Sequence, residues 1–224
     1  MIVAIDGPSG AGKSTVAKAV AKKLGFSCLD TGAMYRSVAW LATQKGIPLN
    51  DDAALGELAR NCKISFKHEE GDPIPKVVFI DGHDVTTAIR TADIDKAVSP
   101  VSAAPSVREA MVLQQQSIGN SGNYVIEGRD IGTTVFPNAE VKVFLTASDE
   151  ERAHRRVRQN VDRGVGSIDY EEVLADLQRR DDYDSSRSTS PLRPADDAVQ
   201  LDSTGMYIED VIDDICEMAQ AKGA

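Results

Sequence analysis

The most constraining feature of this 224-residue sequence is a glycine-rich segment near its start, Gly7-Pro8-Ser9-Gly10-Ala11-Gly12-Lys13-Ser14. The segment matches the pattern G-x-x-x-x-G-K-[ST] in full. It follows an apolar run at residues 2–5 and precedes residues 14–24, whose apolar side chains share one helical stripe. Glycines let the backbone wrap closely around phosphate oxygens, so that several N–H groups point inward at the start of a helix. The sequence therefore predicts a strand, a phosphate-binding loop and a helix in direct succession.

This loop predicts a nucleoside triphosphate site, with ATP as the expected ligand. The residues expected to bind it are Gly7, Pro8, Ser9, Gly10, Ala11, Gly12, Lys13, Ser14 and Thr15. Lys13 brings a positive charge to the β- and γ-phosphates, and the Ser14 hydroxyl is a candidate ligand for Mg²⁺. The motif does not define the reaction. The sequence lacks the N-K-x-D motif of Ras-type GTPases, and a motor or helicase ATPase usually has a larger core, so a small kinase with a separate acceptor site remains.

Strand and helix patterns alternate along most of the chain. Strands are expected at residues 2–5, 26–29, 124–127, 141–146 and 198–201, and helices at 14–24, 33–45, 51–62, 91–98, 106–118, 148–161, 170–183 and 207–221. This alternation predicts an α/β fold with a doubly wound parallel sheet of about five strands. Residues 63–90 break the rhythm, because two strand patterns precede Asp81-Gly82, a strong two-residue hairpin signal. We expect a small antiparallel insert there.

We expect a single P-loop kinase domain over residues 1–224. Its core would comprise residues 1–35, 120–148 and 190–224. An acceptor-binding region would span residues 36–118 and contain the insert at 63–90, and a lid would span residues 152–170.

Arginines occupy the places where an acceptor should bind. Arg36 and Arg129 lie just beyond two of the expected strands, and ligands of open α/β sheets bind outside the carboxyl ends of the strands. The planar guanidinium fork suits a phosphate monoester, because it donates two parallel charge-assisted hydrogen bonds. Arg180, Asp184 and Arg187 share one helical face if the helix continues through them. Ion pairs at a solvated helix end are the alternative for these three residues.

The densest basic segment is expected to form the lid. It contains Arg152, Arg155, Arg156, Arg158 and Arg163, and it ends at Gly164-Val165-Gly166, a possible hinge. A kinase must exclude water and neutralise the charge of the transferring phosphoryl group, so a mobile arginine-bearing lid fits. The alternative is a helix surface on which these arginines pair with acidic neighbours.

Composition excludes several other classes of function. The formal net charge of −10 disfavours binding to nucleic acid or to an anionic membrane. Three scattered cysteines suggest neither a disulfide framework nor a zinc site. No apolar run approaches the roughly 18–20 residues of a membrane helix. A cytoplasmic protein without a nucleic-acid or membrane partner is expected.

Together the motifs resemble those of the bacterial cytidylate kinases, which are nucleoside monophosphate kinases. The resemblance covers essentially the whole chain. Its motifs are residues 5–14, 29–36 (Leu-Asp-Thr-Gly-Ala-Met-Tyr-Arg), 106–110, 128–133 (Gly-Arg-Asp-Ile-Gly-Thr), 151–156, 180–182 and 190–192. The resemblance implies an ATP:CMP phosphotransferase that uses Mg²⁺, acts on CMP and dCMP, and is usually a monomer.

The resemblance also implies roles for individual residues. Arg36, Arg129 and Arg187 would hold the acceptor phosphate, Arg180 with Asp184 the sugar, and Ser99, Arg108 and Asp130 the cytosine. Thr31, Tyr35 and Gly128, within the matching motifs, complete the expected substrate site. Lys13, Arg129, Arg155 and Arg156 are the expected catalytic residues.

The cytosine assignment also makes physical sense. Cytosine offers an amino donor at N4 and acceptors at N3 and O2, which a carboxylate and an arginine match. Uracil would leave the carboxylate facing an oxygen, which disfavours binding. Two other functions stay open from the residues alone: a P-loop kinase for another acceptor, such as a different monophosphate, shikimate or dephospho-coenzyme A, and a nucleotide-binding regulatory module.

Overall fold

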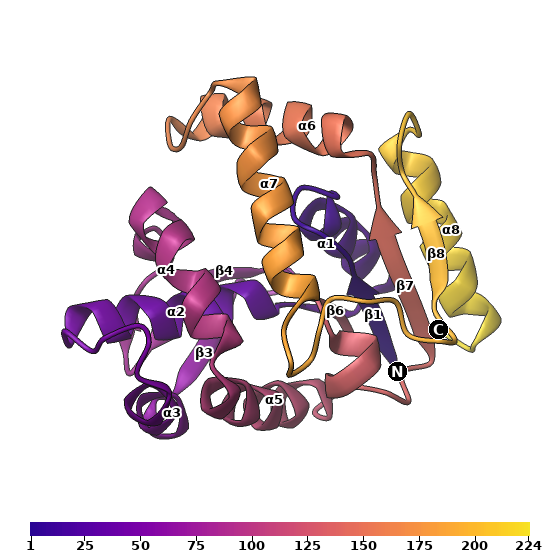
Figure 1. The fold of residues 1–224 in the computed structure, drawn as a ribbon. Helices are drawn as coiled ribbons and strands as arrows, with labels where there is room; N and C mark the ends of the chain where they lie inside the picture. The colour runs from indigo at the N-terminus through magenta and orange to yellow at the C-terminus, as the bar shows by residue number, and fades with distance from the viewer.

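A five-stranded parallel sheet forms the centre of the molecule (Figure 1), as described by a computed structural model of residues 1–224. Its strands, in spatial order, are β2 (Ser27–Asp30), β6 (Tyr124–Glu127), β1 (Ile2–Asp6), β7 (Val141–Thr146) and β8 (Val199–Asp202). All four neighbouring pairs are parallel. Every residue of the central strand β1 is buried, because a parallel sheet is covered on both faces. The predicted α/β class and the number of parallel strands are confirmed.

The chain forms eight α-helices, six of which cover the two faces of this sheet. The eight are α1 (Lys13–Leu24), α2 (Thr31–Gln44), α3 (Asp52–Asn61), α4 (Ala92–Ala103), α5 (Pro105–Gly119), α6 (Asp149–Arg163), α7 (Tyr170–Ser185) and α8 (Ile208–Ala221). Alternate residues of β1 enter two different apolar clusters, because successive strand side chains point to opposite faces. The larger cluster packs α2 to α5 against one face, and the smaller one packs α1 and α8 against the other. The sheet is therefore doubly wound.

The expected antiparallel insert is present. It consists of β3 (Ile64–His68), β4 (Pro75–Ile80) and β5 (His83–Asp84), followed by a 3₁₀ turn at Ala88–Arg90. The hairpin turn places Asp81 at φ 49° and Gly82 at φ 80°. Positive φ at both central residues is what a type I′ turn requires, and it explains the Asp-Gly pair.

Helix α4 is longer than its sequence pattern predicts. The pattern placed its end near residue 98, but the helix continues through Pro100 to Ala103. Val98 and Val101 are buried in the larger apolar cluster on either side of the proline. Their packing outweighs the hydrogen bond and the steric fit that a proline removes from a helix interior. A π-helical segment at Ile131–Val135, directly after the Gly128-Arg129-Asp130 motif, was also not predicted.

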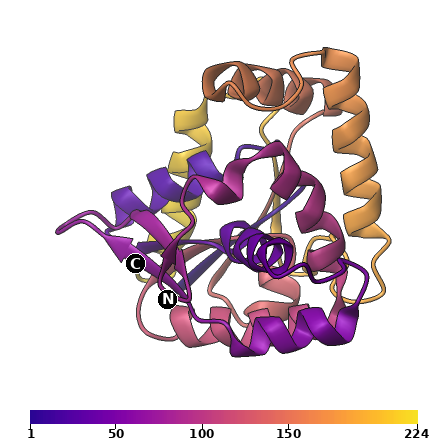
Figure 2. The ribbon, with the colours of Figure 1, turned by 90° about the vertical axis from the view of Figure 1, so that its left-hand side faces the viewer.

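Helices α6 and α7 form an arm that projects from the sheet (Figures 1 and 2). Ala153 on α6 and Val173 and Leu177 on α7 form a small apolar cluster of their own, separate from both main clusters. The division into core, acceptor region and lid stays a prediction. None of the helices combines the length and the apolar character needed to cross a membrane.

Candidate active site

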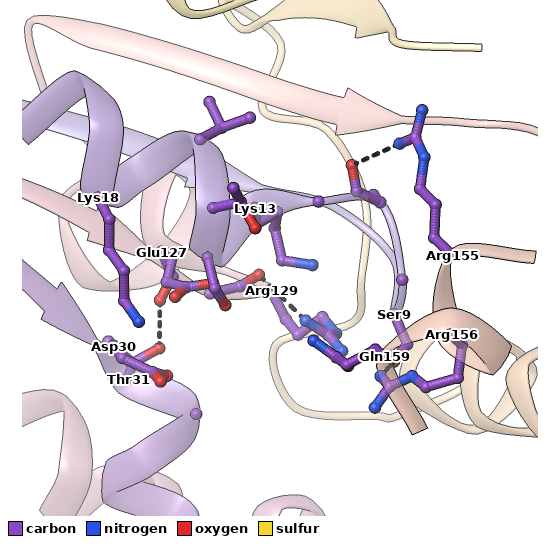
Figure 3. A pocket seen from close by; sticks show the side chains of 18 of the residues that line it. Ser9, Lys13, Lys18, Asp30, Thr31, Glu127, Arg129, Arg155, Arg156 and Gln159 are labelled. Atoms are coloured by element: carbon purple, nitrogen blue, oxygen red, sulfur yellow. Dashed lines mark hydrogen bonds between the residues drawn. The ribbon is translucent and has the colours of Figure 1, made fainter. Parts of the chain in front are cut away.

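A cleft of about 1320 Å³ lies at the carboxyl ends of the central strands. Its walls come from the phosphate loop and α1, from the ends of β2 and β6, from α2, and from the α6–α7 arm. Side chains from these segments, which are far apart in the sequence, point into the same space (Figure 3). The cleft is large enough to hold two small ligands side by side.

The loop before α1 has the geometry of an anion cradle. Gly7, Gly10 and Gly12 have φ values of 146°, 80° and 93°, which residues other than glycine rarely adopt. A Cβ atom on Gly7 would lie 2.0 Å from the Leu145 carbonyl oxygen, so no other residue fits. None of the backbone N–H groups from Gly10 to Ser14 donates a hydrogen bond within the protein. These free donors and the N-terminus of α1 together attract an anion.

Lys13 lies between this loop and the end of β6 (Figure 3). The residue is buried, and its Nζ donates to the Pro8 carbonyl oxygen at 2.6 Å. Burial first, and then the nearby Arg129, lower the pKa of Lys13 well below its ordinary value. A phosphate group placed beside it would oppose both effects. Lys13 is therefore poised to interact with an anionic ligand in the cradle.

The hydroxyl of Ser14 meets a carboxylate at the end of β6. Glu127 and Asp30 are register partners at the ends of β6 and β2. Ser14 Oγ donates to Glu127 Oε2 at 2.7 Å, while Glu127 Oε1 is buried without a hydrogen-bond partner. Burial, reinforced by the negative charge of Asp30, raises the pKa of Glu127 to about 7. The Ser14 hydroxyl and the Glu127 carboxylate, with its unpartnered Oε1, offer oxygen ligands of the kind that a divalent cation prefers, while the Asp30 carboxylate accepts from the Ala33 N–H and lies near Arg90.

Asp6, at the end of β1, binds the backbone directly after the Gly128-Arg129-Asp130 segment. Its two carboxylate oxygens accept hydrogen bonds from the N–H groups of Ile131 and Gly132 at 2.8 and 2.7 Å. Burial raises the pKa of Asp6 to about 6, although both hydrogen bonds oppose this shift. The carboxylate at the end of β1 thereby fixes the start of the π-helical segment.

Arginines surround Asp184 on the opposite wall of the cleft. Arg129 Nε donates to Asp184 Oδ2 at 3.0 Å, and Arg187 Nε donates to the Asp184 carbonyl oxygen at 3.1 Å. Burial raises the pKa of Asp184, but the surrounding arginines lower it further, so that its net shift is downward. Burial and the neighbouring Arg129 and Arg36 lower the pKa of Arg180 to about 9. The positive charges in this wall exceed the nearby negative ones, which favours an anionic ligand.

A buried ion pair joins Arg108 to Asp130 deeper in the same wall. The two side chains are only 3% and 5% exposed. Arg108 Nη1 also donates to the Ser102 carbonyl oxygen at 2.9 Å, and its guanidinium lies 5.3 Å from the centre of the Tyr35 ring. Burial raises the pKa of Tyr35 to about 12. A guanidinium, a carboxylate and an aromatic ring therefore meet in one pocket, where they can recognise a planar polar group.

The arginines of α6 have different environments. Arg155 donates to Ser203 Oγ and to the Ser203 carbonyl oxygen, both at 3.0 Å, and Arg156 Nη2 donates to Ser9 Oγ at 3.0 Å. Both line the cleft. Arg152 lies behind the phosphate loop and does not line the cleft. Burial, followed by repulsion from Arg36, Arg163 and Arg129 with Asp95 opposing, lowers the pKa of Arg156.

Most of the residues predicted from the sequence line this one cleft. They are Ser9, Gly10, Ala11, Gly12, Lys13, Ser14, Thr15, Thr31, Tyr35, Arg36, Arg108, Gly128, Arg129, Asp130, Arg155, Arg156, Arg180, Asp184 and Arg187. Gly7 and Pro8 do not line it; they shape the loop from beneath. Ser99 is also absent from the wall, whereas Val98 and Ser102 on the same helix line it. The roles of all these residues stay predictions.

The sequence reasoning missed several members of the wall. They include Asp30, Glu127 and Gln159, together with the apolar Met206, Ile208 and Val211. Arg163, which the sequence analysis placed in the lid, also lines the cleft. Glu127 carried a detectable signal, because a charged residue ended an otherwise apolar strand directly before the Gly128-Arg129-Asp130 motif. The apolar residues carried no comparable signal, since apolar side chains at the start of a helix are common in any fold.

The chain is similar to known proteins of one family. The family model described as cytidylate kinase matches residues 3–221. The chain belongs to the cytidylate kinase family. A cytidylate kinase from Enterococcus faecalis is 50% identical over 99% of this chain and 96% of its own length.

Some relatives in the cytidylate kinase family are longer. A bifunctional pantoate ligase/cytidylate kinase from Trichormus variabilis is 51% identical, and this chain spans only 41% of its length. Among solved structures, an uncharacterized protein from Eubacterium ventriosum has a TM-score of 0.51 at 11% identity, with 99% of both chains covered. At that identity the likeness concerns the fold alone.

Proposed function

We propose that this protein transfers the γ-phosphoryl group of ATP to CMP or dCMP, giving ADP and CDP or dCDP. The observation that carries the proposal is the pairing of two different binding surfaces in one cleft. One surface is the cradle of free N–H groups from Gly10 to Ser14, and the other contains the buried Arg108–Asp130 pair. Relatives of nearly the same length are described as cytidylate kinases.

The donor side positions the triphosphate. The free N–H groups and Lys13 would hold its β- and γ-phosphates. Mg²⁺ fits beside Ser14 Oγ and the Glu127 carboxylate, where Glu127 Oε1 has no protein partner, and Asp30 lies at the neighbouring strand end. When bound, the ion supplies positive charge that offsets the charge of the phosphates. Arg155 and Arg156 on α6 would add further positive charge from the arm.

The acceptor side would orient the nucleotide monophosphate. Arg36, Arg129 and Arg187 would hold the acceptor phosphate, and Arg180 with Asp184 the sugar. Each of Arg36, Arg129 and Arg187 already has a carboxylate neighbour, Asp95 for Arg36 and Asp184 for the other two. The acceptor phosphate would share or replace these contacts. Positioning and charge neutralisation then supply most of the rate enhancement, and no covalent intermediate is needed.

The proposal also accounts for the choice of base. Asp130 would accept from the N4 amino group of cytosine, and Arg108 would donate to N3 and O2. Because both side chains are buried, a uracil oxygen would face the Asp130 carboxylate with no water molecule to donate a hydrogen bond to either acceptor. This arrangement disfavours the binding of UMP.

Measuring ADP formation from ATP and Mg²⁺ with each of CMP, dCMP, UMP, AMP, GMP and dTMP tests the proposal. We expect CMP and dCMP alone to stimulate turnover strongly. Stimulation by a different monophosphate would contradict the base assignment. ADP formation that is unaffected by all six monophosphates would favour a non-nucleotide acceptor or a regulatory role.

A further inference from the structure

The peptide groups of Ser9 in the phosphate loop are held by side chains from both helices of the arm. Arg152 Nη1 on α6 donates to the Ser9 carbonyl oxygen at 2.8 Å. The Ser9 N–H donates to Asp181 Oδ1 on α7 at 3.1 Å. Arg152 and Asp181 also form an ion pair with each other. The three residues make a closed arrangement, which we name the Ser9 bracket.

The Ser9 bracket is built into the base of the arm. The Arg152 side chain is only 5% exposed, and it also donates to the Ala147 carbonyl oxygen at 3.1 Å and to Asp149 Oδ1 at 2.5 Å. A Cβ atom on Gly10 would lie 3.2 Å from Arg152 Cβ, so the loop packs directly on this residue. Four of the five N–H donors of the guanidinium are therefore engaged within the protein, one by Ala147, two by Ser9 and Asp181, and one by Asp149.

Neither Arg152 nor Asp181 lines the cleft, although Arg155 and Arg156 on the same helix do. The bracket therefore does not act by contacting a bound nucleotide directly. The bracket instead occupies the outer side of the loop at Ser9 and leaves the N–H groups from Gly10 to Ser14 free on the inner side.

We propose that Arg152 and Asp181 are positioning residues that fix the phosphate loop in its anion-binding form. Gly7, Gly10 and Gly12 flank Ser9 and give this backbone unusual freedom. If the Ser9 peptides rotated, a carbonyl oxygen could face the phosphates and repel them. Holding both the N–H and the C=O of Ser9 prevents that rotation, so the cradle is formed before the ligand arrives. This inference rests on the proposed function only in taking ATP as the donor.

Isothermal titration calorimetry of the full chain with MgATP, MgADP and CMP tests this role. The variants are Asp181→Asn and Arg152→Lys, which keep most of the side-chain volume and weaken the bracket. The amide loses the charge of the ion pair with Arg152, and the ammonium loses the planar fork that donates to Ser9 and Asp181 together. Matched controls on α7 are Asp182→Asn, at the exposed neighbouring position, and Arg179→Lys, whose side chain is 73% exposed. We expect Kd for MgATP and MgADP to rise about tenfold or more in both bracket variants, since small misplacements of binding groups can cost about 100-fold. In the bracket variants, Kd for CMP should change less than twofold. In the two control variants, Kd for every ligand should change less than twofold.

The number of binding sites per chain separates positioning from folding. If the bracket only stabilised the fold, the variants would show fewer sites with unchanged Kd for MgATP, which would overturn the proposal. An equal loss of CMP affinity would overturn it as well. A wild-type protein that binds MgATP but is not stimulated by CMP would contradict the proposed function and leave the bracket comparison valid. A wild-type protein that binds no ATP would overturn both.

Discussion

Replacing Asp130 by asparagine isolates the charge of the buried Arg108–Asp130 pair. The side chains are 3% and 5% exposed, so solvent screens little of their interaction. Without the carboxylate charge, the buried Arg108 guanidinium has only neutral acceptors, the Ser102 carbonyl oxygen and the amide oxygen of the substituted side chain. Removing one partner of a buried pair costs about 3–5 kcal/mol, and the amide retains one oxygen. We therefore expect the free energy of unfolding to fall by about 3 kcal/mol.

Urea denaturation and thermal unfolding at pH 7 measure this change. For a chain of this size the loss corresponds to a Tm decrease of about 6–12 °C. The matched control is Asp176→Asn, which removes the charge from an ion pair with Arg179 whose side chains are 66% and 73% exposed. That variant should lose about 0.5 kcal/mol or less, because exposed pairs contribute little. Similar losses in the two variants, or a loss below about 1 kcal/mol for Asp130→Asn, would refute the reasoning from burial.

Four further variants test other parts of the site. Lys13→Ala should lower kcat by about 100-fold or more with an unchanged circular dichroism spectrum, because the residue acts on the phosphates; near-normal kcat would contradict this. Gly7→Ala should prevent normal folding, since its Cβ would lie 2.0 Å from the Leu145 oxygen, and a wild-type Tm would be inconsistent with that clash. Glu127→Gln should raise the Mg²⁺ concentration needed for half-maximal turnover about tenfold, as one carboxylate charge is lost. The pKa of Asp6, raised to about 6, means that the native state binds more protons than the unfolded state between about pH 4 and 6. The stability of the wild type relative to Asp6→Asn should therefore fall across this window as the pH rises and level off above it; a flat difference in urea denaturation would argue against the shift.

The local elements of the fold could be predicted because their causes are local. The Asp81-Gly82 turn adopts positive φ at both positions, and the phosphate loop adopts positive φ at three glycines, as the residue types require. Such conformations depend on a few consecutive residues, so their sequence signals are strong. Helix α4 shows the opposite case. Its sequence pattern predicted an end near residue 98, and the burial of Val98 and Val101 against distant parts of the chain explains why the helix continues through Pro100.

The same distinction between local causes and distant contacts applies to the candidate site. The sequence by itself determined the cradle of N–H groups, because consecutive residues build it, and it located arginines at strand ends because the carboxyl edge of a parallel sheet is where ligands bind. Only the tertiary structure decided which charges meet. Arg108 pairs with Asp130 across 22 positions of the chain, and Ser9 reaches Asp181 across 172. No spacing rule connects such positions, since their proximity follows from how the helices pack on the sheet. The physical reason is that hydrogen bonds and ion pairs act over a few ångströms, and packing alone brings distant residues within that range.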